Sequence, residues 1–188
     1  MTDPVPRELN LENLSIISSA IPKYWEHFLF YGTLLGFHRE GNILENDDDV
    51  DIMMERGLRE EFLKLVVTYT PFNIRLNNRD ITQLIRTING ISTYVDIYYY
   101  YNVPEKDHII DRWNTRCTPI TTEDGQKIRG QTLKIPKDIL FPIKIDYLQD
   151  IPVNIPHKPE DCCRYVYGKS FMTPSHKHSG GFYEILKP

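Results

Sequence analysis

The sequence predicts an α/β (α+β) domain, in which helices flank a mixed β-sheet and an irregular, proline-rich C-terminal segment forms a wall. Segments with helical spacing of apolar residues alternate with β-branched and aromatic runs, and two of the β-like runs are adjacent. Seven of the 13 prolines lie at or beyond Pro136, which favours short strands and loops there. A chain of 188 residues is expected to form one domain over 1–188.

The N-terminal part contains a helix signal followed by a strand signal. Apolar residues with a loose helical spacing end at Pro22, so we expect a short first helix. The apolar run 27–31 predicts a buried strand. This strand should turn sharply at Gly32-Thr33 into a helical segment over 34–39.

The remaining elements follow from the same periodicities. Residues 57–69 have helical spacing and are followed by a proline. The stretches 72–76 and 81–88 have β character, and the two asparagines between them indicate a hairpin. The run 94–101 is rich in β-branched and aromatic residues, and a brief helix is expected over 160–167.

Composition limits the classes of function. The chain has 22 basic and 26 acidic residues, a net charge of −4, so general nucleic-acid binding is not expected. No apolar run approaches the roughly 20 residues of a membrane span, and the start has no signal-peptide pattern, so we expect a soluble, cytoplasmic protein. The three cysteines, Cys117, Cys162 and Cys163, have no CxxC spacing and are expected to be reduced thiols.

A group of carboxylates is the most informative feature of the sequence. A solvated acidic turn is the simple interpretation. However, Val50, Ile52 and Met54 alternate with Asp49, Asp51 and Met53, so Asp49 and Asp51 should share one face of a strand. Their repulsion there must either raise a pKa or recruit a counter-ion, and a divalent metal is the economical answer. Hard oxygen ligands favour Mg²⁺ or Mn²⁺. The group consists of Glu40, Glu45, Asp47, Asp48, Asp49, Asp51 and Glu55.

Asp96 is a further acid within an apolar and aromatic strand. If that strand pairs with the 49–54 strand in register, three acids form a triad that can hold one or two divalent ions for displacement at phosphorus. The alternative is a salt bridge with Arg86 or Arg112. The Gly32-Thr33 pair is a weak sign of phosphate binding, because glycine permits close backbone approach and a helix start offers free amides.

Several short motifs in order resemble the LicD family, to which the fukutin group is related. They are YGTLLG at 31–36 with Arg39 after it, DDDVDI at 47–52, YVDI at 94–97, LFP at 140–142, and YGKSFMTP at 167–174. The resemblance covers about residues 24–174. It implies a nucleotidyltransferase fold, a mixed sheet whose glycine motif and DxD strand hold a metal-bound nucleotide.

The resemblance also implies roles for individual residues. Asp49, Asp51 and Asp96 would be metal ligands and catalytic acids, and Asp96 would also be able to accept the proton of the acceptor. Gly32 and Thr33 would contact the donor phosphate, which Arg39 would help to neutralise. In addition, the acids at 47 and 48 match the acidic lead-in of the family and would tune the metal site from outside its direct ligands.

The predicted function is a metal-dependent transferase. It would move a phospho-alcohol group resembling phosphocholine or ribitol phosphate, or a sugar phosphate, from a CDP-linked or other NDP-linked donor to a glycan hydroxyl. Two alternatives stay open. One is a nucleotidyltransferase that adds a nucleoside monophosphate to a protein, RNA or small molecule, and the other is a catalytically silent subunit that binds nucleotide or glycan.

Other residues have weaker functional interpretations. The tyrosines at 98–101 could stack on a base or sugar, although packing is the expected use. The histidines His157, His176 and His178 give only a weak zinc signal. Basic residues of the C-terminal wall could supply phosphate-binding charge: Lys144, Lys158, Arg164 and Lys169.

Overall fold

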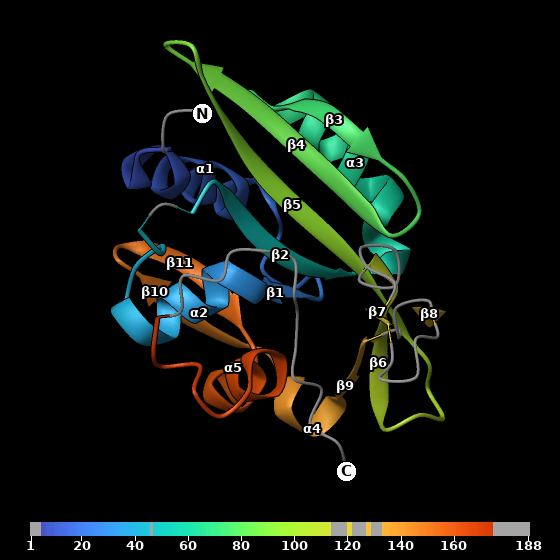
Figure 1. Cartoon of the computed structure of the whole chain (residues 1–188). Helices are drawn as coiled ribbons and strands as arrows, with labels where there is room; N and C mark the ends of the chain where they lie inside the picture. Colours follow the sequence, from blue (N-terminus) through green and yellow to red (C-terminus); the bar gives the residue numbers. More distant parts are fainter. Residues whose placement is uncertain (1–4, 46, 114–119, 122–126, 129–132, 175–188) are drawn as a thin grey trace.

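The computed structural model describes residues 5–45, 47–113, 120–121, 127–128 and 133–174 (Figure 1). The described helices are α1 (Arg7–Ala20), α2 (Tyr31–Glu40), the 3-10 turn η1 (Arg56–Leu58), α3 (Arg59–Tyr69), α4 (Lys137–Leu140) and α5 (Pro159–Tyr167). The described strands are β1 (His27–Leu29), β2 (Asp49–Glu55), β3 (Asn73–Asn77), β4 (Ile81–Ile88), β5 (Ile91–Asn102), β6 (His108–Asp111), β7 (Ile120–Thr121), β8 (Lys127–Ile128), β9 (Leu133–Pro136), β10 (Lys144–Leu148) and β11 (Ile151–Ile155).

The main sheet is mixed, as the sequence predicts. Its strands lie in the order β1-β2-β5-β4-β3, and β6 and β9 continue from the far end of β5. The pair β2–β5 is parallel, whereas β1–β2, β5–β4 and β4–β3 are antiparallel. The connection from β2 to β5 passes through η1, α3 and the β3–β4 hairpin, so an acidic strand and an aromatic strand that are distant in the chain become neighbours.

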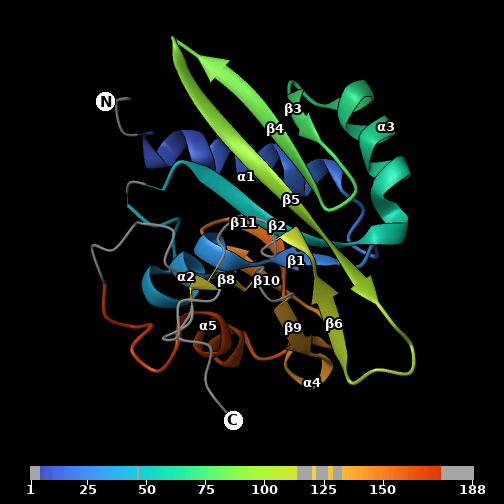
Figure 2. The same cartoon turned by 45° about the vertical axis from the view of Figure 1, so that its right-hand side comes forward.

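Helices α1 and α3 lie on the same side of this sheet (Figures 1 and 2). Asn13 of α1 donates a hydrogen bond to Thr93 Oγ1 of β5 at 2.8 Å, and Glu12 accepts one from Arg86 of β4 at 2.8 Å. Phe62 of α3 is fully buried. Because these contacts cover the face that carries Thr93 and Arg86, the residues that alternate with them point to the opposite face.

Most predicted segments form the expected elements, but the first turn of α2 starts earlier than predicted. The strand ends at Leu29, and the helix begins at Tyr31 instead of near residue 34. Phe30 donates its amide to the carbonyl of Asp51 at 3.2 Å and accepts from the Leu34 amide at 3.0 Å, which closes the first helical turn. Tyr31 has φ +42°, and this local change of direction places Gly32 within the helix.

The C-terminal wall contains more regular structure than its prolines suggest. The expected brief helix is confirmed as α5, and β10 and β11 pair as an antiparallel hairpin. The short helix α4 was not predicted. It begins directly after Pro136, whose restricted φ fits the approach to a helix start. Helix α5 packs against α2 and α4, which attaches the wall to the main domain.

The core lies on both faces of the central strands. Val50 and Ile52 of β2 are at most 3% exposed on the face toward α1 and α3, and Met53 of β2 and Tyr100 of β5 are fully buried on the opposite face. Within the described ranges, no helix is long and apolar enough to cross a membrane.

Candidate active site

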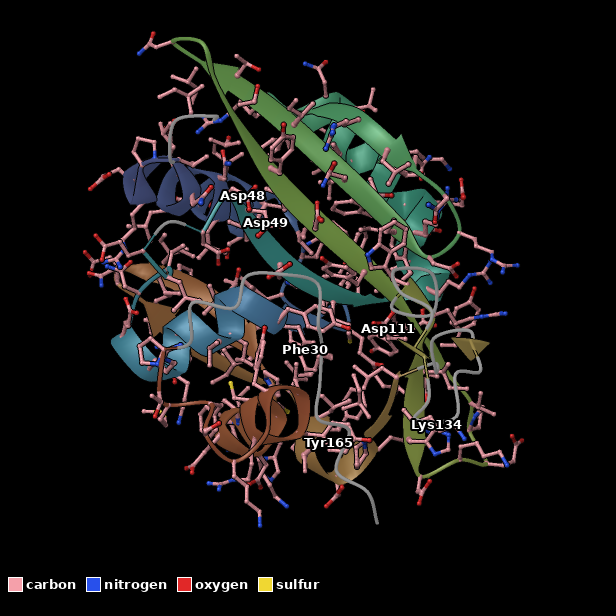
Figure 3. The ribbon with its side chains drawn as sticks, viewed as in Figure 1. Phe30, Asp48, Asp49, Asp111, Lys134 and Tyr165 are labelled. Carbon is pink, nitrogen blue, oxygen red and sulfur yellow. The ribbon has the colours of Figure 1, made fainter. Side chains whose placement is uncertain are left out.

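Strand pairing brings the three predicted acids together. Asp51 and Asp96 are direct partners in the parallel β2–β5 register, and Asp49 lies two residues before Asp51 on the same face of β2. Figure 3 shows Asp49 at the start of β2, next to β5. The site therefore forms where β2 enters the sheet, on the face opposite α1 and α3.

The start of α2 fixes the position of Asp51. The Gly32 amide donates to Asp51 Oδ2 at 2.8 Å, and the Asp51 amide donates to Thr33 Oγ1 at 2.8 Å. A Cβ atom at position 32 would lie 2.9 Å from Asp47 Oδ2 and 3.1 Å from Asp51 Oδ2. Only glycine leaves room for both carboxylates at this point.

Burial and mutual repulsion disfavour the charged form of these acids. Asp51 and Asp96 are 5% and 6% exposed. Burial, followed by the charges of neighbouring carboxylates, raises the pKa of Asp49 to about 8 and the pKa of Asp47 to about 7. The same causes raise the pKa of Asp51 well above its usual range. Full ionisation of the cluster at neutral pH is therefore unfavourable without a nearby cation.

Asp96 is contacted by Tyr98, for which the sequence suggested only stacking or packing. Burial raises the pKa of Asp96 to about 6, and the nearby Gln83 amide and Tyr98 hydroxyl oppose this effect. Tyr98 donates its hydroxyl to Asp96 Oδ2 at 3.4 Å, and its ring packs on Tyr31 with centroids 4.9 Å apart. The two-residue spacing from Asp96 to Tyr98 could have indicated that they share a face.

The acids immediately before β2 are closer to the site than expected. Carboxylate oxygens of Asp47, Asp48 and Asp49 all lie within 4.8 Å of one another. Asp47 Oδ2 and Asp96 Oδ1 are buried and have no hydrogen-bond partner among the described residues. Asn10 of α1 donates to the Asp47 carbonyl at 2.8 Å and so anchors this segment, although no sequence signal identified Asn10.

The other predicted site residues occupy different positions. The Gly32 amide and the buried Thr33 hydroxyl both bond to Asp51, so their predicted contact with donor phosphate stays a prediction. Arg39 lies in the last turn of α2, and its charge acts on Cys163 of α5. In the described part of the chain, Arg39 is in no ion pair with the acids.

The salt-bridge alternative for Asp96 is wrong for Arg86 and finds no support for Arg112. Arg86 pairs with Glu12 on the opposite face of the sheet. The Arg112 guanidinium lies over the Tyr101 ring at 5.4 Å. Ion pairs between described residues do not include Asp96.

The tyrosine run serves mainly in packing, as expected. Tyr99 and Tyr100 are fully buried, and their hydroxyls bond to Thr82 and Glu26. Tyr101 donates to Asp80 at 2.9 Å.

Cys162 and Cys163 are buried free thiols whose pKa is raised by burial. Cys117, His176 and His178 lie outside the described residues.

Basic residues of the wall mostly contact the wall itself. Lys144 Nζ donates to the His157 carbonyl at 2.8 Å, and Arg164 pairs with Glu160 at 2.6 Å. Lys158 lies 3.7 Å from an oxygen of Asp138.

A mixed sheet with a DxD strand, a third acid on the parallel neighbour and a glycine at the adjoining helix start is the arrangement expected of the nucleotidyltransferase fold. The family model described as LicD/FKTN/FKRP, nucleotidyltransferase domain, matches residues 25–158. The chain belongs to this family, and it is a nucleotide-using transferase of phosphate-containing groups.

A solved structure of a nucleotide-transferring enzyme shows a similar fold. The chain is similar to the lincosamide antibiotic adenylyltransferase LnuA with lincomycin bound, at 13% identity, 84% coverage of each chain and a TM-score of 0.50. A putative nucleotidyltransferase from Thermotoga maritima has 16% identity, with 82% of this chain and 81% of that chain covered and a TM-score of 0.43. The comparison with curated protein sequences gave no match.

Proposed function

We propose that this protein is a metal-dependent transferase that moves a substituted phosphate group from a CDP-linked or other NDP-linked donor to a glycan hydroxyl. The transferred group would be a phospho-alcohol or a sugar phosphate. The observation that carries the proposal is the convergence of Asp49, Asp51 and Asp96 on one buried sheet face, where no described lysine or arginine pairs with them.

The residues fit a divalent cation. Carboxylate oxygens are hard ligands of the kind that Mg²⁺ and Mn²⁺ prefer. Two buried oxygens, Asp47 Oδ2 and Asp96 Oδ1, have no hydrogen-bond partner among the described residues and are available as ligands. Asp49, Asp51 and Asp96 would hold the ion, with Asp47 and Asp48 as further candidate ligands. A bound ion supplies positive charge for the phosphoryl oxygens and the leaving group.

The residues of the chain would orient the reaction. Gly32 and Thr33 fix both the carboxylate and the backbone of Asp51, so the acid keeps one position while substrate binds. In the transfer, the acceptor oxygen forms a bond to phosphorus, and the bond from phosphorus to the departing nucleoside monophosphate breaks. Asp96 would hold the ion through one carboxylate oxygen and take the acceptor proton with the other. A role of Arg39 in neutralising donor phosphate remains part of this proposal.

The preference for a CDP-linked donor and a glycan acceptor rests on the family resemblance. Nucleotidyl transfer would use the same acids, but the acceptor would attack the phosphorus next to the nucleoside, so that the nucleoside monophosphate is transferred and the rest of the donor leaves. Mass spectrometry of the product separates the two reactions, because one adds a phospho-alcohol or sugar phosphate and the other adds a nucleoside monophosphate.

The test is a panel of CDP-alcohols and nucleotide sugars, assayed with Mn²⁺ or Mg²⁺ and glycan acceptors. We expect metal-dependent turnover by the wild type and its loss in Asp51→Asn, whose circular dichroism spectrum should match that of the wild type. Asp150→Asn is a suitable control because Asp150 is an exposed turn residue outside the site. Full activity of Asp51→Asn would overturn the assignment.

A further inference from the structure

An arginine on the outer strand of the sheet reaches toward the acids. Arg75 lies on β3, and its Cζ is 5.0 Å from the centre of the Tyr94 ring on β5. Its Nη1 donates to Gln83 Oε1 on β4. The side chain thus crosses one strand and holds its planar group over the next, with both a ring and an amide to orient it.

The sheet register places this guanidinium beside the catalytic face. Tyr94 is the direct partner of Asp49, and Gln83 is the direct partner of Asp96. Neighbouring strands are about 4.8 Å apart, so the ring under Arg75 is one strand from the DxD motif.

Arg75 differs from other arginines of this sheet and of α3. Arg59, Arg79 and Arg86 each form an ion pair with a carboxylate. The ion pairs found in the described ranges do not include Arg75, and its side chain is exposed. A guanidinium that is already oriented loses less side-chain entropy when it binds an anion.

The charge of the expected substrate requires such a group. Three ionised aspartates and one divalent ion leave a net negative charge, and a diphosphate diester adds two more negative charges. Without another cation on this face, the donor would bind against repulsion. Arginine recognises phosphate oxygens through charge-assisted hydrogen bonds.

We propose that Arg75, oriented by Tyr94 and Gln83, binds a phosphate oxygen of the nucleoside diphosphate part of the donor. This assignment rests on the proposed function. It makes Arg75 a substrate-binding residue on the β3–β4 side of the acids, opposite the side from which α2 approaches.

The experiment measures Mn²⁺ binding alone and then CDP binding at saturating Mn²⁺, by titration calorimetry, with UDP, GDP and ADP in parallel. Arg75→Gln removes the charge, and Arg75→Lys keeps the charge without the planar fork. The matched control is Arg56→Gln. Arg56 is also exposed and lies 4.8 Å from a tyrosine ring, but that ring belongs to Tyr101 near the other end of β5.

We expect Arg75→Gln to weaken CDP binding by about tenfold to a hundredfold, the range for a hydrogen bond to a charged group. Arg75→Lys should lose less, whereas Arg56→Gln should bind CDP like the wild type. Mn²⁺ affinity should be the same in all four proteins. In the transferase assay, Arg75→Gln should raise KM for the donor more than it lowers kcat.

The outcomes separate the two proposals. Wild-type affinity for CDP in Arg75→Gln would overturn the role of Arg75 and leave the proposed function intact. Equal losses in Arg75→Gln and Arg56→Gln would also overturn it, because they would indicate a general effect of charge. A wild type that binds none of the nucleoside diphosphates with Mn²⁺ would overturn the proposed function itself.

Discussion

Replacing Asp51 by asparagine should separate the stability of the fold from its capacity to hold a cation. Burial and the charges of Asp49, Asp47 and Asp96 raise the pKa of Asp51 well above its usual range. Asparagine has nearly the same shape, can still accept the hydrogen bond from the Gly32 amide, and carries no charge. We therefore expect the metal-free variant to unfold at a temperature no lower than that of the wild type at pH 8.

The wild type should gain stability from Mn²⁺, and the variant should not. A ligand at a hundred times its Kd stabilises the folded state by about 2.7 kcal/mol. For a chain of 188 residues, 1 kcal/mol changes Tm by about 2–4 °C, so Mn²⁺ should raise the wild-type Tm by roughly 5–11 °C. Thermal unfolding followed by circular dichroism over a Mn²⁺ series measures this shift, with Asp150→Asn as the control.

The pH dependence gives a second measurement of the same cluster. The folded-state pKa is about 6 for Asp96, about 7 for Asp47 and about 8 for Asp49, against 3.8 for an ordinary aspartate. The folded state therefore binds more protons than the unfolded state, so metal-free stability should fall as pH rises from about 4 to about 8. Mn²⁺ should reduce this loss. An equal Mn²⁺ shift in Asp51→Asn and wild type would refute the reasoning.

Three further predictions concern other parts of the structure. Gly32→Ala should weaken Mn²⁺ binding in the same titration, because its methyl group would lie 2.9 Å from Asp47 Oδ2; unchanged affinity would contradict this packing. Overpacking by this methyl group should lower the free energy of unfolding by about 1–3 kcal/mol, and the better helix propensity of alanine should offset roughly 1 kcal/mol of that loss. Burial lowers the pKa of His27 to about 4, so between pH 6.5 and 4 the wild type should lose up to ~3 kcal/mol relative to His27→Leu in urea unfolding, and parallel pH profiles would exclude the shift. Phe62→Ala should cost about 3–5 kcal/mol by the same assay, because Phe62 is fully buried, and a loss below 1 kcal/mol would place it outside the core.

Local periodicity was sufficient to predict the acidic strand β2 and the helix α3, although not the start of α2. The alternation of Asp49, Val50, Asp51 and Ile52 gave both the strand and the shared face of the two acids. The helical spacing before Pro71 likewise gave α3. These segments are predictable because the periodicity of buried and exposed positions can be recognised within each short stretch of sequence.

Features that depend on long-range pairing could not be predicted from local periodicity, and the triad of acids was predicted only on the condition that its strands pair and from the family resemblance. The alternation of β5 shows that Asp96 and Tyr98 share a face, but only the register shows that Asp96 lies beside Asp51 and Gln83. Arg75 lies at a register irregularity between β3 and β4, and no local pattern in the sequence indicates its contact with the Tyr94 ring. The left-handed backbone conformation of Tyr31 could not be predicted from the sequence either, because residues other than glycine rarely adopt it.

The parallel pairing of β2 with β5 means that the acids cannot meet within a local segment of the chain. Asp51 and Asp96 lie on strands that are separated in the chain by α3 and the β3–β4 hairpin, so their contact is non-local and raises the contact order of the fold. A cation whose ligands come from both strands would bind the folded sheet and would not bind partly folded chains in which these strands are unpaired. Cation binding would thus measure the fraction of molecules that are fully folded. Destabilising substitutions in β5 that are distant from the acids would lower this fraction.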